Sequence, residues 1–264
     1  MKFGKRIVCA ALVLLAAAAL GFAGGSGESG ASGVDGIKKA GVLKVGVKSD
    51  VPKFGLVNTA TGKYEGLEIE LSRLIAKDIL GDAEKVEFTP VTAKTRGPLL
   101  DTGELDLVIA TFTVTEERKL TYNFSSTYYV DAVGMLVKKS DGLSGLKDCN
   151  GKVIGVAQSA TSRKAIQEAA DKLGIKISFA EFATYPEIKA ALDSGRVDVF
   201  SVDKSILNGY LDDQSVILPD AFSPQEYGVA SKLDNKALAA YIDGLIQKWL
   251  KDGTIAGLIT QFGL

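Results

Sequence analysis

Hydrophobic positions along the first half of the chain follow two alternating patterns. Short apolar runs rich in β-branched residues are typical of buried strands, and longer segments with apolar residues at helical spacing are typical of amphipathic helices. A helix commonly ends at a glycine, and Gly81 and Gly103 stand where two helical segments stop. The patterns predict strands at 43–47, 86–91, 105–112 and 132–138, and helices at 67–80 and 98–102.

The same cycle then repeats. Strands are expected at 153–157, 177–180 and 197–202, a helix from Thr161 to about Leu173, and a short helix from Pro186. Two stretches 92 residues apart are nearly the same, LDTGELDL at 100–107 and LDSGRVDV at 192–199. Two copies of one βαβαβ unit predict an α/β fold with two similar lobes, each a mostly parallel sheet flanked by helices.

The last part of the chain is expected to return to the first lobe. A strand at 227–231 precedes helices at 234–250 and 254–262, and Trp249 lies on an apolar helix face. The chain then crosses between lobes twice, near 135–139 and 222–228. Two such crossings form a two-strand hinge, which permits closure over a ligand.

The N-terminus has the pattern of an export signal. A basic segment at 1–6 precedes an apolar run at 7–20 that is too short to span a membrane, and small residues stand at 21 and 23. We therefore expect an exported or periplasmic protein. The expected division is a signal peptide at 1–23, a flexible leader at 24–35, a first lobe at 36–136 and 227–264, and a second lobe at 137–226.

Composition excludes several classes of function. Removing residues 1–23 takes three of the 31 basic residues and none of the 32 acidic ones, so the mature charge is −4 and nucleic acid is disfavoured as a partner. The chain has no histidine, which excludes histidine-based triads, metal ligands and general bases. Cys149 is the one cysteine left, and we interpret it as a small apolar core residue. We expect no catalytic residue, cofactor or bound metal.

Polar side chains follow the expected strands at their carboxyl ends, where open parallel sheets bind ligands. Through the offset of 92 residues, Asp203 corresponds to Thr111, so we expect these two to face each other between the lobes. The candidate ligand-binding residues are Lys48, Arg96, Thr111, Thr113 and Arg118 in the first lobe and Gln158, Thr161, Tyr185 and Asp203 in the second.

Arg118 has two interpretations. Thr115 is a good helix N-cap, and a cation in the first helical turn is disfavoured by the helix dipole. Arg118 could form a salt bridge with Glu116, Glu117 or a neighbouring loop. Alternatively, with Thr113 and free backbone N–H groups, it holds an anionic group of a ligand.

The other candidates also have structural alternatives. Asp203 could cap a helix at 204–211, Thr161 could cap its own helix, and Tyr185 could pack against Pro186. Lys48 and Arg96 could be solvated loop charges. Their joint placement at strand ends favours ligand contact.

The charges of these candidate residues then narrow the choice of ligand. Asp203 suits an ammonium group and one arginine suits a carboxylate, which together describe an α-amino acid. Lys48 and Arg96 remain, and buried unpaired charge costs several kcal/mol. A second carboxylate would offset them, so the sequence predicts aspartate or glutamate.

Two motifs carry a family resemblance. Residues 66–79 (GLEIELSRLIAKDI), and residues 113–119 (TVTEERK) followed by 123–125 (NFS), make the mature chain similar to the bacterial extracellular solute-binding proteins of family 3. Residues 91–100, 110–113 and 200–207 most resemble the branch of that family that binds aspartate and glutamate. The resemblance implies a two-lobed periplasmic-binding-protein ("Venus flytrap") fold.

The resemblance also implies residue roles. Arg118, Thr113 and Thr161 would hold the α-carboxylate, and Asp203 and the Thr111 carbonyl the ammonium group. Lys48, which stands where a glutamine binder has an aspartate, would hold the side-chain carboxylate with Arg96, and Tyr185 would close the far side. Val51 stands where many relatives have an aromatic residue, so aromatic stacking must come from Phe54 or Tyr185, or be absent.

The expected function is therefore a monomeric exported receptor that delivers an acidic amino acid to the membrane permease subunits of an ABC transporter. One alternative is binding of another polar amino acid such as glutamine. The other is an exported enzyme on the same fold, similar to cyclohexadienyl dehydratases. One methylene changes binding only modestly, so the sequence does not rank aspartate against glutamate.

Overall fold

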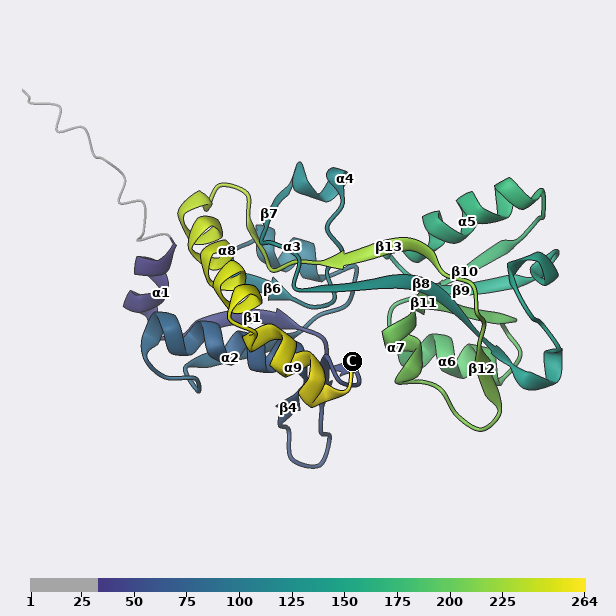
Figure 1. Ribbon diagram of the computed structural model, residues 1–264, viewed down its shortest axis with the longest axis horizontal. Helices are drawn as coiled ribbons and strands as arrows, with labels where there is room; N and C mark the ends of the chain where they lie inside the picture. The colour runs from purple at the N-terminus through teal and green to yellow at the C-terminus, as the bar shows by residue number, and fades with distance from the viewer. Residues whose placement is uncertain (1–32) are drawn as a thin grey trace, which may run out of the picture. The chain divides into compact units, whose positions relative to one another are not determined.

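The first sheet is formed by the apolar runs of the first and last parts of the chain (Figure 1). The structure, a computed structural model, describes residues 33–264, so the expected signal peptide and most of the leader lie outside it. β1 pairs in parallel with both β5 and β6, as the strand–helix alternation predicted, while β14 is antiparallel to its neighbours. The strand order is β5 (Val86–Pro90), β1 (Leu43–Val47), β6 (Leu107–Ile109), β14 (Ala230–Lys232) and β7 (Tyr122–Phe124).

The second sheet repeats this arrangement. Its central strands β9 and β11 are almost wholly buried, because helices cover them, and β9 is parallel to both β10 and β11. The strand order is β10 (Ser178–Phe182), β9 (Val153–Ala157), β11 (Val199–Asp203), β8 (Tyr129–Lys138) and β12 (Ser215–Ile217), with β13 (Phe222–Tyr227) also pairing with β8. The predicted two-lobed α/β fold is therefore confirmed. The sheets are mixed rather than mostly parallel, because β8 pairs antiparallel with β11, β12 and β13 and β14 pairs antiparallel with β6 and β7.

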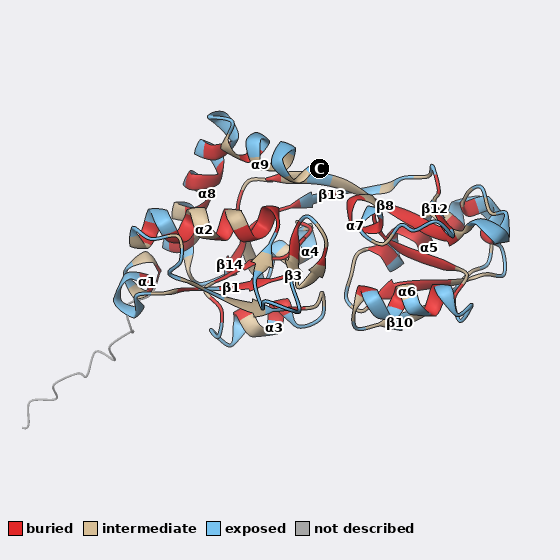
Figure 2. Ribbon diagram, turned by 90° about the horizontal axis from the view of Figure 1, so that it is seen from below, coloured by how far each residue is buried: buried red, intermediate tan, exposed pale blue. Residues whose placement is uncertain are grey.

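Helices lie against both sheets with their apolar faces inward (Figure 2). Trp249 is buried in the core, as predicted. No helix within residues 33–264 has the length and apolar character needed to cross a membrane. The helices are α1 (Val34–Ala40), α2 (Leu67–Leu80), α3 (Arg96–Asp101), α4 (Glu116–Lys119), α5 (Ser162–Leu173), α6 (Tyr185–Asp193), α7 (Lys204–Asn208), α8 (Lys236–Lys251) and α9 (Thr254–Phe262), with 3-10 turns at η1 (Lys139–Asp141) and η2 (Leu146–Cys149). A small sheet joins β2 (Asp50–Val51), β3 (Gly55–Val57) and β4 (Tyr64–Glu65).

Strands β8 and β13 run antiparallel beside each other and connect the two large sheets (Figure 1). Tyr129 pairs with Tyr227 at one end of this ribbon and Val133 with Phe222 at the other. From Val133 onward, β8 also pairs with β11 of the second sheet. This pairing favours a lobe boundary a few residues before the one at 136 that the sequence suggested, and the division into lobes stays a proposal.

The strand expected at 105–112 is shorter than predicted. β6 ends at Ile109, and Thr111 has a φ of 45°, a left-handed conformation that breaks strand pairing. The Thr111 N–H donates instead to Oε1 of Glu68 over 2.6 Å. The bend interrupts the strand, and residues 112–114 then pair with residues 226–228, where the Gly228 N–H donates to the Phe112 carbonyl and the Val114 N–H donates to the Glu226 carbonyl.

Helix α2 begins against the loop at Lys53 and Phe54, because Gly66 allows a close backbone approach. Gly66 has a φ of 131°, and the N–H groups of Leu67 and Glu68 donate to the Lys53 and Phe54 carbonyls over 2.7 and 3.0 Å. These carbonyls satisfy N–H groups that a helix start otherwise leaves free. The contact fixes the position of Glu68.

We expect Gly66→Ala to lower the free energy of unfolding by about 2–3 kcal/mol, because the new methyl group would overlap the Phe54 carbonyl at a φ that side chains rarely adopt. Urea denaturation measures the loss. Gly257→Ala is the matched control, since it lies exposed in α9 with open space around it and should be neutral or stabilise by up to about 1 kcal/mol. Equal destabilisation by both substitutions would contradict the role of Gly66.

Candidate functional site

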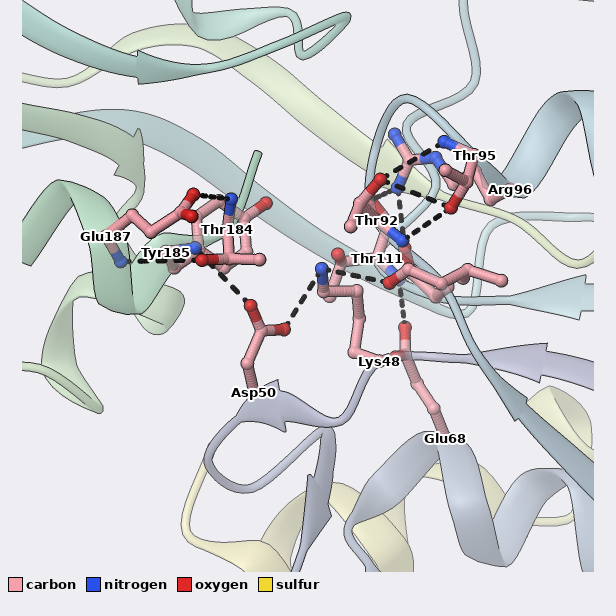
Figure 3. A network of polar contacts seen from close by, with 12 residues as sticks. Lys48, Asp50, Glu68, Thr92, Thr95, Arg96, Thr111, Thr184, Tyr185 and Glu187 are labelled. Carbon is pink, nitrogen blue, oxygen red and sulfur yellow. Dashed lines mark hydrogen bonds and ion pairs between the residues drawn. The ribbon is translucent and has the colours of Figure 1, made fainter. Parts of the chain in front are cut away.

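Lys48 follows β1 and is almost fully buried, with 2% of its surface exposed, so it is not a solvated loop charge. Its Nζ lies 3.0 Å from Oδ1 of Asp50, 3.3 Å from the Val91 carbonyl and 4.7 Å from the centre of the Tyr185 ring (Figure 3). Burial lowers the pKa of the Lys48 amine, while the Asp50 charge opposes this shift. Lys48 therefore has a carboxylate partner, which the charge count from the sequence did not include.

Arg96, at the start of α3, is also buried rather than solvated. Its Nη1 donates to the carbonyls of Ala110 and Thr111 over 2.6 and 3.1 Å, and its guanidinium stacks 4.0 Å from the centre of the Phe112 ring. Its Nε has no hydrogen-bond partner. Arg96 forms no ion pair with any carboxylate within residues 33–264.

Arg118 forms no salt bridge to Glu116 or Glu117 in the structure, so the local interpretation of this residue is wrong. Thr115 caps α4 as predicted, by accepting from the Arg118 N–H over 3.1 Å. The guanidinium donates instead to the carbonyls of Thr113 over 2.7 Å and of Ser159 over 3.1 Å, across from one lobe to the other. Burial lowers the pKa of this guanidinium, and the nearby Arg96 charge adds to the effect.

Thr113 and Thr161, from different lobes, meet at one oxygen. Both hydroxyls donate to Oε1 of Gln225, over 2.8 and 2.6 Å, while Nε2 of Gln225 donates to the Ser223 carbonyl. The Thr161 hydroxyl therefore does not cap α5, contrary to the simpler interpretation. An anionic ligand group would have to take these two donors from Gln225, a residue that the sequence gave no reason to select.

Asp203 ends β11 and is buried. It precedes α7, but its carboxylate does not cap that helix and accepts instead from the Tyr227 hydroxyl. Burial raises the pKa of Asp203 to about 7, although the Tyr227 hydrogen bond acts in the opposite direction. Asp203 has no cationic partner in the part of the chain that the structure describes.

Glu68 was not a candidate from the sequence, yet its side chain is completely buried. Oε1 accepts from the Thr111 N–H over 2.6 Å (Figure 3). It also accepts from the Tyr128 hydroxyl over 2.6 Å, while Oε2 has no hydrogen-bond partner. Burial raises the pKa of Glu68 to about 7 against the lowering effect of these two hydrogen bonds. A signal was present, because Glu68 lies on the buried face of α2 with Leu71 and Ile75.

Two aromatic rings border the charged side chains: Phe112, which stacks on the guanidiniums of Arg96 and Arg118, and Tyr185. The Tyr185 ring faces Lys48 and packs against Phe200 at 6.2 Å, so it does not simply cover Pro186. Its N–H is 3.4 Å from Oδ2 of Asp50. Phe54, the other aromatic candidate, is fully buried and packs against Tyr129 and Tyr227.

A cavity of about 730 Å³ adjoins the cluster. Residues 115–118 line it from the first lobe, and residues 159–161 with Ser223 line it from the second. Arg118 and Thr161 thus border open space, whereas Lys48, Arg96 and Asp203 lie deeper among other side chains.

A match of the family model for "Bacterial extracellular solute-binding proteins, family 3" covers residues 43–264. The chain therefore belongs to this family. Its fold, with two sheets joined by two strands and polar side chains at the strand ends, agrees with that membership.

Two curated relatives are similar over most of their length. A glutamine-binding protein of Geobacillus stearothermophilus is 39% identical over 203 residues, which cover 76% of each chain. The ABC transporter glutamine-binding protein GlnH of Bacillus subtilis is 36% identical over 220 residues, 82% of this chain and 79% of the relative.

A solved structure shares the fold. It is the ancestral amino acid-binding protein AncCDT-1, a precursor of cyclohexadienyl dehydratase, with a TM-score of 0.76 and 29% identity over 88% of this chain and 99% of that one. The names of these three proteins describe binding proteins rather than enzymes.

Proposed function

We propose that this protein captures an acidic L-amino acid, aspartate or glutamate, between its lobes and passes it to the permease of an ABC transporter. The family membership and the amino-acid-binding relatives support an amino acid as the ligand. The description of the family as extracellular supports an extracytoplasmic location, and the name of the Bacillus subtilis relative, an ABC transporter binding protein, supports permease subunits as partners. No catalytic role is proposed for any residue of the site.

One observation carries the choice of an acidic ligand. Arg96 and Arg118 are two guanidiniums without a carboxylate partner, and Asp203 is a carboxylate without a cationic partner, within residues 33–264. Lys48 is already paired with Asp50. A ligand with two carboxylates and one ammonium group would complement this set, because buried charges need partners.

Glutamine is the second candidate. The two curated relatives are named as glutamine-binding proteins, and the Lys48–Asp50 pair leaves one cation fewer for a side-chain carboxylate than the sequence suggested. If Glu68 is ionised, it partly offsets Arg96, and the site then matches a zwitterion. The net charge of the site therefore decides between an acidic amino acid and glutamine.

Calorimetry on the mature protein with aspartate, glutamate, glutamine and arginine tests the proposal. A ligand of about ten heavy atoms contributing roughly −1 kcal/mol each would reach a micromolar or lower Kd. We expect at least one acidic amino acid to bind about tenfold more tightly than glutamine, and arginine to bind weakly. Tighter binding of glutamine than of both acids would overturn the acidic assignment.

A further inference from the structure

We propose that Glu68 is a specificity-determining residue, whose carboxyl group controls how much positive charge the site presents to the ligand's side chain. This inference rests on the part of the proposed function that places an amino acid in this site, with its side chain near Arg96. It does not depend on which amino acid the native protein prefers, because it concerns the change in preference when the Glu68 charge is removed.

The position of Glu68 carries the inference. Its Oε1 holds the Thr111 N–H, and the Thr111 carbonyl accepts from Arg96 over 3.1 Å, so one short bend connects Glu68 to the guanidinium expected at the ligand's side chain. The side chain is fully buried, and its Oε2 has no hydrogen-bond partner. Water does not screen a charge at such a position, so its effect on nearby groups is strong.

Glu68 has two separable roles. As a hydrogen-bond acceptor it supports the left-handed conformation of Thr111, and a neutral side chain with an amide oxygen could do the same. As a carboxylate it offsets Arg96 and Lys48, which a neutral side chain cannot do. Glu68→Gln keeps the acceptor and removes the charge.

We expect Glu68→Gln to raise the ratio of glutamate to glutamine affinity about tenfold at pH 8, measured by calorimetry. Glu70→Gln is the matched control: it removes the same charge two residues along α2, where Glu70 pairs with Arg73 at 2.5 Å, and should leave the ratio unchanged. Glu68→Ala removes both roles and should weaken both ligands. A Glu68→Gln protein that binds both ligands equally more weakly, or with an unchanged ratio, would overturn the inference.

The pH dependence of the ratio, compared between the native protein and Glu68→Gln, gives a second test. The groups facing Glu68 are Lys48, Arg96, Thr111 and Tyr128. Burial lowers the pKa of Lys48 and of Arg96, and the Glu68→Gln protein controls for their titration because it keeps both cations and lacks the carboxyl group. Asp203 titrates in this range but faces the ammonium group, which both ligands share.

In the native protein, the ratio of glutamate to glutamine affinity should rise as pH falls, because Glu68 becomes neutral while the glutamate side chain, with a pKa of about 4.3 in water, stays charged. In Glu68→Gln it should be flat. A flat ratio in the native protein would contradict the inference. Native preference for glutamine, with the ratio still rising, would overturn the proposed function and leave the inference intact.

Discussion

We expect Arg118→Ala to abolish detectable binding of every amino acid, with a loss of affinity of about 100-fold or more. Its guanidinium donates to carbonyls of both lobes and has no carboxylate partner within the described residues. In the proposed function it meets the α-carboxylate, which all amino acids share. Removing one partner of a buried charge pair costs about 2–5 kcal/mol.

Calorimetry with glutamate and glutamine measures the loss of affinity, which should be about the same for both ligands. Arg163→Ala is the matched control, because Arg163 lies in α5 close to Ser159 but is largely exposed and paired with Glu181. Arg118→Lys should give an intermediate loss, since it keeps the charge without the two-pronged guanidinium. Strong binding of either ligand by Arg118→Ala would refute its role at the α-carboxylate.

Periodicity and capping rules predicted most of the fold because they depend on local sequence. The strand at Leu43–Val47 and the helices at Leu67–Leu80 and Thr254–Phe262 have the predicted bounds. The early end of β6 was missed, because the bend at Thr111 depends on a hydrogen bond to Glu68, 43 residues away. Contacts of that kind leave no local pattern.

The site was predicted only in part, again because contacts between residues far apart in the sequence leave no local pattern. Strand-end reasoning selected Lys48, Arg96 and Asp203, all of which are buried in one region of charges. It missed the partners that change their chemistry, namely Asp50 beside Lys48 and Gln225 between two threonines. The charge at a site depends on pairings between elements, and only the fold supplies these.

Replacing Arg96 should weaken the binding of acidic amino acids more than the binding of glutamine. We expect Arg96→Gln to weaken aspartate or glutamate binding about 100-fold and glutamine binding by less than about tenfold. In the proposed function its guanidinium faces the side-chain carboxylate, which glutamine lacks. The Gln side chain ends two atoms short of the Arg96 Nη1 position, so it gives up the bond to the Ala110 carbonyl, and the stability of the variant is measured beside its affinities.

Calorimetry with both ligands, together with a thermal unfolding curve, separates the role in binding from the role in folding. Lys94→Gln removes a positive charge from the same loop at an exposed position and should change neither affinity. Arg96→Lys, which retains the charge, should keep more affinity for the acids than Arg96→Gln. If Arg96→Gln instead weakens acidic and neutral ligands by the same factor while its Tm is unchanged, Arg96 does not distinguish the side chains. The second carboxylate would then lack its partner in this site, and glutamine would become the better proposal.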